Sequence, residues 1–361
     1  MMIMERKKMS EIKLKDENWV NGLYDEIKTL VIHSRNHIVT EINLTLLQTY
    51  WEIGKRIVTN EQNHSERAEY GRALLKGLSK MLTKEFGRGF SVSNLQFMRR
   101  FYQEYEIQQT LSVKLSWSHY CELLSISDKN KRSFYEKETV NSNWSVRELK
   151  RQISTSLYER LLLSAGKENK EKVLELALKG NEIQSSSDIV KDPYVFEFLG
   201  LPEEKPIMES DLEKALITHI ENFLLELGKG FMYVGSQQRV TLGNTHYYVD
   251  MVFYNKILRS YVLIELKTGK LMPEAVGQLN MYLNYFREEV NDEMDAEPIG
   301  IILCTDKENV QAEYALGGIS NTIFASRYTL YIPNKEVLQA ELEKVIGAYE
   351  KDKSKHNPKN D

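Results

Sequence analysis

The sequence lacks the features that mark membrane, secreted and zinc-binding proteins. Its longest apolar runs, residues 261–264 and 299–304, fall far short of the roughly 20 residues needed to span a bilayer. No hydrophobic stretch follows the basic N-terminal residues, so we expect no secretory signal. The two cysteines fit no metal or disulfide spacing, and the seven histidines form no HxH or HExxH motif. The sequence therefore predicts a cytoplasmic protein without a membrane segment or a zinc site.

Glycine-rich phosphate loops are also missing, since no GxGxxG, GxxxxGKS or GxxxxGKT string occurs, and this argues against nucleotide hydrolysis. The charges, in contrast, are unevenly distributed. Residues 1–160 contain 26 Lys and Arg against 20 Asp and Glu, whereas residues 161–361 contain 22 against 32. A basic half beside an acidic half is expected if the first contacts phosphates and the second holds cations. Ordinary variation in surface charge is the alternative.

Residues 17–165 have the apolar spacing of helices and predict an all-α domain. Leu30, Ile38, Ile42, Leu46 and Tyr50 recur at intervals of four or eight residues. Short helices separated by tight turns predict an arrangement similar to a helix-turn-helix. Residues 1–16 show no clear apolar period, and we expect them to form a frayed tail.

Serines mark two helix starts in this domain. Ser91 and Ser93 follow a pair of glycines and are suitable N-caps for the next helix. Ser145 precedes Glu148 by three residues, which is the spacing of a capping box.

Residues 166–207 contain serine runs and three prolines, which predicts a connecting segment. Its aromatic-rich stretch 194–201 should pack on a domain. Residues 208–350 then predict a helix (212–227), three strands (231–234, 247–254, 261–266), a helix (273–288), a strand (299–304), a short helix (308–316), a strand (323–331) and a closing helix to 349. This order predicts an α/β domain with a mixed sheet flanked by helices. Residues 351–361 should be a disordered tail.

Three charged residues interrupt the apolar strands of this domain. Asp250 lies in one strand, and Glu265 and Lys267 lie in the next. Because alternate residues of a strand share a face, Glu265 and Lys267 should point the same way as Leu263, with Ile264 on the other side. A hairpin would bring Asp250 close to Glu265. Unpaired buried charges cost several kcal/mol, so folding alone gives no reason for these residues.

A magnesium ion would supply that reason. Mg²⁺ prefers oxygen ligands, typically one or two carboxylates together with water, carbonyl and phosphate oxygens. Asp250 and Glu265 are the predicted ligands, with the Leu266 carbonyl as a third and Mn²⁺ as a substitute ion. Such an ion polarises a phosphate and acidifies a bound water, and Lys267 would stabilise the developing charge. The alternative is a buried Glu265–Lys267 ion pair that only fixes strand register.

These residues also resemble a known signature. Asp250, a 14-residue interval and the string Glu265-Leu266-Lys267 are similar to the PD-(D/E)XK nuclease motif, although Tyr248-Val249 stands where a proline commonly precedes the Asp. The strings FLLELGKGFMYVG, YYVDMVFYN, LRSYVLIELKTGK and PEAVGQLNMYL resemble the bacterial YhcG-type nucleases. YWEIGKRIV, GRGFSVSNLQFMRRFY and WSVRELKRQI resemble the helical domain paired with that core. The resemblance spans residues 19–349. It implies a restriction-endonuclease-like fold and a metal-dependent phosphodiesterase, and we favour an endonuclease over an exonuclease.

The resemblance implies two further site residues. The helix after the motif often supplies a Gln or Lys, and Gln278 occupies that place, with a surface glutamine as the alternative. The helix before the first strand usually supplies a Glu that contacts the metal through water. Glu213, Glu221 and Glu226 all lie there. We favour Glu213, although its spacing from Ser210 also fits a capping box.

Basic residues on the N-terminal helices are candidates for contacts with nucleic acid. They are Arg99, Arg100, Arg147, Lys150 and Arg151. A solvated helix face is the alternative, and the family resemblance favours DNA as the partner. The sequence thus predicts a Mg²⁺-dependent nuclease acting on DNA. Two rival hypotheses stay open: a non-catalytic DNA-binding or regulatory protein, and a subunit of a larger DNA-processing or defence assembly. A homo-oligomer or partner subunits are compatible with each.

Overall fold

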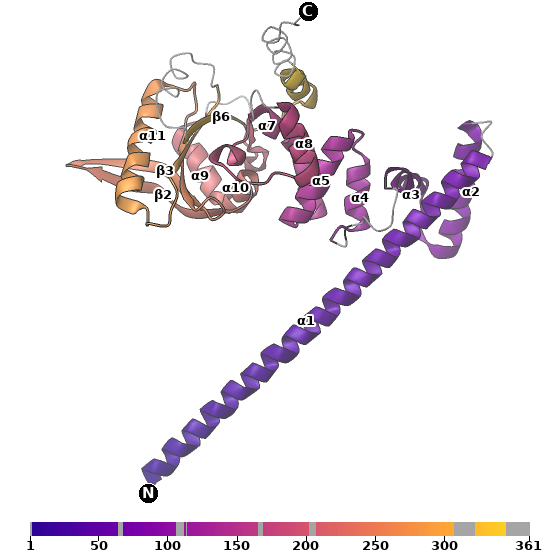
Figure 1. The fold of residues 1–361 in the computed structure, drawn as a ribbon, viewed down its shortest axis with the longest axis horizontal. Helices are drawn as coiled ribbons and strands as arrows, with labels where there is room; N and C mark the ends of the chain where they lie inside the picture. Colours follow the sequence, from indigo (N-terminus) through magenta and orange to yellow (C-terminus); the bar gives the residue numbers. More distant parts are fainter. Residues whose placement is uncertain are drawn as a thin grey trace, which may run out of the picture. The chain divides into compact units, whose positions relative to one another are not determined.

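The computed structural model describes the backbone of residues 2–63, 68–105, 112, 114–164, 169–201, 207–306 and 322–343. It describes their side chains from residue 20 onward, except at positions 63, 68–70, 72 and 169–171. The chain divides into two compact units, Met1–Ser125 and Ile126–Asp361, whose elements are labelled in Figure 1. The division therefore precedes the boundary expected near residue 165. The predicted helix at 308–316 and the predicted tail lie outside the described residues. No helix in the described ranges is both long and apolar enough to cross a bilayer.

The first unit contains only helices in its described part. They are α1 (Met2–Asn63), α2 (Ala68–Phe86), the 3₁₀ turn η1 (Arg88–Phe90), α3 (Val92–Glu104) and α4 (Trp117–Leu124). Since α1 begins at Met2, the helix extends into residues 1–16, where we expected no regular structure. Its C-terminal part packs on α3, with Ile57 beside Leu95 and Met98 in one core. Gly54 allows this close approach because a Cβ there would lie 2.0 Å from the Met98 carbonyl oxygen.

Two serine N-caps predicted from the sequence are present. The Ser91 side chain accepts a hydrogen bond from the Asn94 amide at 3.2 Å and begins α3. The Ser145 side chain accepts one from the Glu148 amide at 3.2 Å and begins α6 (Val146–Ser154). The Glu148 carboxylate accepts a hydrogen bond from Gln152 at 2.7 Å. The helix-turn-helix arrangement stays a prediction.

The second unit combines helices with a six-stranded sheet. Its further helices are α5 (Lys129–Ser142), α7 (Leu157–Ser164), α8 (Asn169–Lys179), α9 (Glu209–Thr218), α10 (Ile220–Leu227), α11 (Pro273–Tyr285) and residues 335–343, with short 3₁₀ or π turns η4 (Ser186–Ile189), η5 (Glu197–Leu199) and η6 (Phe286–Val290). Its strands are β1 (Tyr194–Val195), β2 (Phe231–Leu242), β3 (Thr245–Asn255), β4 (Ser260–Leu266), β5 (Ile299–Cys304) and β6 (Ile323–Thr329). The strand order is β1-β6-β5-β4-β3-β2. The pairs β1–β6, β6–β5 and β5–β4 are parallel, and the pairs β4–β3 and β3–β2 are antiparallel. This confirms the mixed sheet.

Helices cover both faces of this sheet (Figure 1). On one face, Leu216 of α9 and Phe223 of α10 pack in a core with Ile264. On the other face, α11 places Leu279 in a core with Leu263. The alternation of Leu263 and Ile264 therefore follows the prediction. The helix predicted at 212–227 is divided into α9 and α10, because His219 has a non-helical backbone (φ −107°, ψ 34°).

The segment predicted as a connection contributes an edge strand to the sheet. Tyr194 of β1 pairs with Tyr328 of β6 in a parallel register. Phe196 stacks on Tyr328 with ring centroids 5.4 Å apart. Tyr194 and Phe196 are fully buried and Phe198 is partly buried against the same core, so the expected packing of residues 194–201 is confirmed.

A buried ion cluster explains why α6 and α7 fold with the sheet. Glu226 of α10 is fully buried, and its carboxylate lies 2.5 Å from Arg160 Nη1 and 3.1 Å from Arg151 Nη2. The same carboxylate accepts a hydrogen bond from the Val195 amide at 3.1 Å, and Arg160 donates to the Pro193 carbonyl at 3.0 Å. A buried charge is tolerated only with such partners. The cluster therefore holds α6, α7, α10 and residues 193–195 in one unit. This agrees with a division that lies before residue 126.

Candidate active site

The two carboxylates of the motif meet where the pairing of β3 with β4 ends. The last paired residues are Met251 and Ile264. Beyond them, Asp250 Oδ2 accepts a hydrogen bond from the Leu266 amide at 2.8 Å, and Glu265 Oε1 accepts one from the Asp250 amide at 3.4 Å. The hairpin thus brings Asp250 and Glu265 together, as the sequence predicted. The rest of β3 toward Thr245 pairs with β2 alone in the described sheet.

Lys267 lies between two carboxylates. Its Nζ atom is 3.8 Å from Glu265 Oε2 and 3.3 Å from Glu209 Oε2. Glu209 begins α9 and also accepts a hydrogen bond from the Thr268 amide at 3.2 Å. The Glu265–Lys267 separation exceeds a normal hydrogen bond. The motif lysine is therefore not held in a tight pair with Glu265, and a quarter of its side chain is exposed.

Burial of the carboxylates gives this site its electrostatic character. Glu265 is only 2% exposed, and burial together with the nearby charge of Asp250 raises its pKa to about 8. Burial also raises the pKa of Asp250, although the Leu266 amide opposes this shift. Burial alone would lower the pKa of Lys267, but the charges of Glu265 and Glu209 raise it. The site thus disfavours the ionised form of both carboxylates.

Glu213 reaches this site through a glutamine that the sequence did not indicate. Gln237 Nε2 donates to Glu213 Oε2 at 2.8 Å and lies 3.4 Å from Asp250 Oδ1. Gln237 has a φ of +49° within β2, a conformation that non-glycine residues seldom adopt outside functional or tightly constrained sites. Burial raises the pKa of Glu213. Gln237 therefore links the α9 carboxylate to the motif aspartate.

The other two glutamates considered for this role lie elsewhere. Glu221 is exposed on α10, and Glu226 belongs to the buried cluster with Arg160. The capping-box reading of Glu213 was wrong, because the N-cap of α9 is Met208 and Ser210 lies inside the helix.

Gln278 approaches the carboxylates through a tyrosine. Its Nε2 donates to the Tyr282 hydroxyl at 2.6 Å, and that hydroxyl donates to the Tyr248 carbonyl at 3.1 Å. Burial raises the pKa of Tyr282, and the charges of Glu265 and Asp250 raise it further. Gln278 is thus half-buried and linked through Tyr282 to the backbone of β3, two residues before Asp250.

Glu209, Gln237 and Tyr282 were missed by the sequence reading. Each depends on a contact across at least one strand or helix, and none stands at a fixed interval from the motif. Of the three, only Tyr282 could have been found from the sequence. It lies four residues after Gln278, so the two side chains share a helix face.

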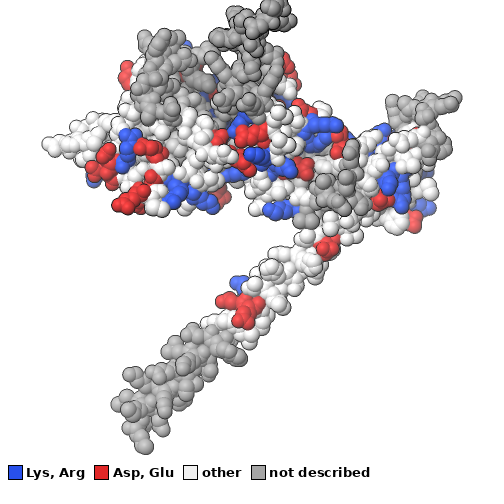
Figure 2. All heavy atoms as spheres, viewed as in Figure 1, with Lys and Arg blue, Asp and Glu red and all other residues white. Residues whose placement is uncertain are grey.

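The candidate DNA-binding residues are divided between the two units. On α3, Arg99 Nε lies 2.7 Å from Glu61 and Arg100 Nε lies 4.0 Å from Glu104. On α6, Arg147 and Lys150 are exposed. Basic and acidic side chains are interspersed on the face of the second unit seen in Figure 2.

Arg151 does not fit the DNA-binding role expected for it. Its guanidinium is held by Glu197 at 2.7 Å and Glu226 at 3.1 Å, with Glu148 at 3.6 Å. Only 18% of the side chain is exposed. Because these carboxylates surround it, Arg151 is a structural residue of the buried cluster.

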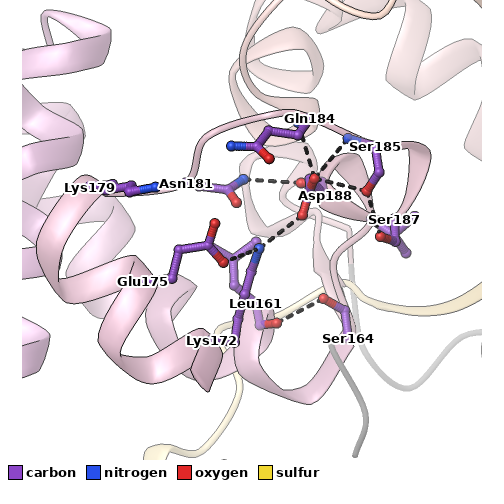
Figure 3. Close-up of a pocket in the computed structure, with 11 residues that line it drawn as sticks. Leu161, Ser164, Lys172, Glu175, Lys179, Asn181, Gln184, Ser185, Ser187 and Asp188 are labelled. Carbon is purple, nitrogen blue, oxygen red and sulfur yellow. Dashed lines mark hydrogen bonds and ion pairs between the residues drawn. The ribbon is translucent and has the colours of Figure 1, made fainter. Parts of the chain in front are cut away.

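A polar pocket of about 580 Å³ lies between α7, α8 and the following loop (Figure 3). Its charged groups neutralise one another, since Lys172 Nζ lies 2.8 Å from Asp188 Oδ1. Asp188 Oδ2 accepts hydrogen bonds from the Gln184 and Ser185 amides. None of the residues at the Asp250–Glu265 site lines this pocket.

Residues 187–343 match the family model described as the YhcG PDDEXK nuclease domain, and residues 26–160 match the DUF1016 N-terminal domain. The protein of Escherichia coli (strain K12) named "Putative nuclease YhcG" is 40% identical over 352 residues, which cover 89% of this chain and 92% of that protein.

Solved structures resemble part of the chain. A repair endonuclease from Pyrococcus abyssi has 18% identity and a TM-score of 0.25, covering 37% of this chain and 50% of that one. EndoMS in its apo form has 20% identity and a TM-score of 0.24, covering 36% and 49% respectively. These scores are too low to support a functional comparison.

Proposed function

We propose that this chain, which belongs to the YhcG family of PDDEXK nuclease-domain proteins, is a divalent-metal-dependent endonuclease that hydrolyses phosphodiester bonds in DNA. The observation that carries the proposal is the meeting of Asp250, Glu265 and Lys267 at one end of the sheet. There the Asp250 carboxylate accepts a hydrogen bond from the Leu266 amide at 2.8 Å, and Lys267 Nζ lies 3.8 Å from Glu265 Oε2. Two buried carboxylates beside a partly exposed ammonium suit a reaction at a phosphate.

The residues present fit Mg²⁺, with Mn²⁺ as a substitute. Within the described residues no three His, Cys, Asp or Glu side chains converge as a complete metal site, but two carboxylates completed by carbonyl, water and phosphate oxygens suit Mg²⁺. Asp250 and Glu265 would hold the ion, together with the Leu266 carbonyl. Burial raises the pKa of both carboxylates, and the charge of Asp250 adds to the shift of Glu265, so a cation bound here would favour their ionised forms. When bound, such an ion polarises the phosphate and acidifies a water molecule.

The protein's own side chains do the positioning. The Leu266 amide and Gln237 fix the two oxygens of Asp250, and Gln237 is itself oriented by Glu213. Lys267 is near enough to Glu265 to offset negative charge on a bound phosphate or to hold the attacking water. The Gln278–Tyr282 pair buttresses β3 through the Tyr248 carbonyl.

DNA as substrate is supported by the charge surplus of residues 1–160 and by exposed basic groups. Arg147 and Lys150 are exposed on α6, while Arg99 and Arg100 keep 40% and 38% of their side chains exposed. Such groups contact phosphates and position the duplex without reading sequence.

The test is an assay of the purified chain on supercoiled plasmid, linear duplex, single-stranded DNA and RNA. We expect cutting of the closed circle with Mg²⁺ or Mn²⁺ and none with EDTA, since a circle has no ends for an exonuclease. Binding without cutting in any ion would contradict the catalytic proposal and support a DNA-binding protein. Cutting only by a complex isolated from cells would instead identify a subunit of a larger assembly.

Replacing Gln237 with glycine is expected to weaken metal binding. Glycine accepts the φ of +49° without strain, so the change removes only the amide that joins Glu213 to Asp250. We expect the Mg²⁺ concentration for half-maximal cutting to rise roughly 10-fold or more, as for other residues that orient a metal ligand. Gln238→Gly, at the exposed neighbouring position, is the matched control. Equal metal requirements in both variants would remove Gln237 from the site.

A further inference from the structure

The exposed part of α1 has no role in the core of the first unit. Eleven large apolar side chains between residues 20 and 46 are 39–68% exposed. The first buried side chain described on this helix is Leu47, and on the side of α1 seen in Figure 2 uncharged residues outnumber the few charged ones. A helix is stabilised in water mainly by packing of its apolar side. An uncovered apolar surface of this length therefore indicates an interaction site.

The eleven side chains form one face of the helix. At 3.6 residues per turn they all fall within about 200° of the circumference. Val20, Ile27, Val31, Ile38 and Ile42 run along the centre of this face. Between residues 21 and 43 the opposite face carries only polar side chains and one glycine. The spacing is that of a helix that packs against another helix along its whole length.

We propose that this face binds the same face of a second copy of the chain, in a parallel helix pair. Residues 20–46 form about 40 Å of helix. Covering their exposed apolar side chains would bury on the order of 800 Å² per copy, which is the share of each partner in a standard protein interface. Because both copies have the same apolar spacing, each residue meets its equivalent across a twofold axis.

The charges favour a second copy over a lipid surface. A helix that lies on a membrane has Lys and Arg along its polar face. The polar face of α1 instead carries Asp25 and Glu26, both exposed, with His33 and His37 between residues 30 and 40. An acidic face is repelled by anionic lipid, whereas it stays in water when two helices pair.

The edges of the apolar face select the parallel orientation. Lys28 and Arg35 lie on one side of the centre of the apolar face, and Glu41 lies at its other edge. In a parallel pair, a twofold axis along the helices places the basic edge of one copy beside the acidic edge of the other. An antiparallel pair would bring like charges together.

Sedimentation of the full-length chain tests the association. We expect a dimer of the 42.1 kDa chain. Val31→Asp with Ile38→Asp, at the centre of the face, should raise the dimer dissociation constant at least about 100-fold. Thr29→Asp with Asn36→Asp has the same charge and spacing on the opposite face and should leave the dimer intact. Circular dichroism of each variant shows whether the helix is retained. A monomeric wild type, or a dimer that survives the Val31 and Ile38 changes, overturns the proposal.

A disulfide tests the orientation. Thr45 lies near the centre of the face, toward one end of the exposed stretch, so only a parallel pair places residue 45 beside its equivalent. Thr45→Cys in a Cys121→Ser background should form a covalent dimer under mild oxidation. Thr29→Cys on the opposite face should not. Dimeric Thr45→Cys protein that forms no disulfide overturns the parallel arrangement.

Discussion

Lys267→Ala should reduce DNA cutting by roughly 100- to 1,000-fold while leaving DNA binding almost unchanged. The expected size is that of removing one preorganised group that stabilises charge in a transition state. Lys267 is suited to this role because its ammonium lies 3.8 Å from Glu265, with a quarter of the side chain exposed to an incoming phosphate. Single-turnover cutting at saturating Mg²⁺ measures the effect, and a DNA-binding titration under the same conditions separates catalysis from affinity.

Lys270→Ala provides the matched control, since it removes the same charge three residues away. Lys270 is 68% exposed and pairs with Asp306 at 3.3 Å rather than with the motif carboxylates. It should cut DNA at nearly the wild-type rate. If both variants cut equally well, Lys267 has no part in the chemistry, and the proposed site loses its charge-stabilising group.

Glu226→Gln should destabilise the second unit by roughly 3–5 kcal/mol, the cost of leaving one member of a buried ion pair without its partner. Glu226 and Arg160 are both fully buried at 2.5 Å, and Arg151 shares the same carboxylate. Because the chain has two units, global unfolding need not be a single transition. Hydrogen exchange of β3, β4 and β5 amides in native conditions reports on the second unit alone.

An exposed ion pair serves as the comparison. Glu297→Gln removes a carboxylate 2.6 Å from Arg287, but the side chains are 58% and 36% exposed, so the change should cost below about 1 kcal/mol. Equal protection in the two variants would show that the buried cluster contributes nothing special to stability.

Acid gives a second signature of the same cluster. Burial alone would raise the pKa of Glu226, but the charges of Arg160, Lys191 and Arg151 lower it to about 2 from its ordinary 4.5. A carboxylate with a lowered pKa in the folded state stabilises the protein above its unfolded pKa, and that stability is lost as pH falls from about 4.5 toward 2. Glu226→Gln should therefore make the second unit less sensitive to acid in this range.

Local sequence patterns predicted much of the second unit. Strand β5 occurs at the predicted residues, and the alternation in β4 placed Leu263 and Ile264 on opposite faces. These features depend on near neighbours in the chain, because the period of a strand is set by its own backbone. The hairpin that brings Asp250 to Glu265 follows from the same period and a short turn.

Predictions about residues whose contacts are far away in the sequence were less successful. Arg151 has the type and spacing of a DNA-binding residue, yet Glu226 lies 75 positions away in sequence and contacts its guanidinium. Gln237 and Glu209 contact Asp250 and Lys267, although no sequence motif marks either residue. The apolar period of α1 predicted a helix correctly, but Leu30 and Ile38 are exposed on it.

The sequence by itself determined the motif of Asp250, Glu265 and Lys267, the family, and the order of the strands from β2 to β6, because each depends on residue type and on spacing along the chain. Only the tertiary structure decided which charges face one another. It placed Arg151 and Glu226 in a buried cluster, linked Glu213 to Asp250 through Gln237, and ended the first unit before α5. The reason is that a charge takes its role from the groups that surround it in space, and long-range packing brings those groups together.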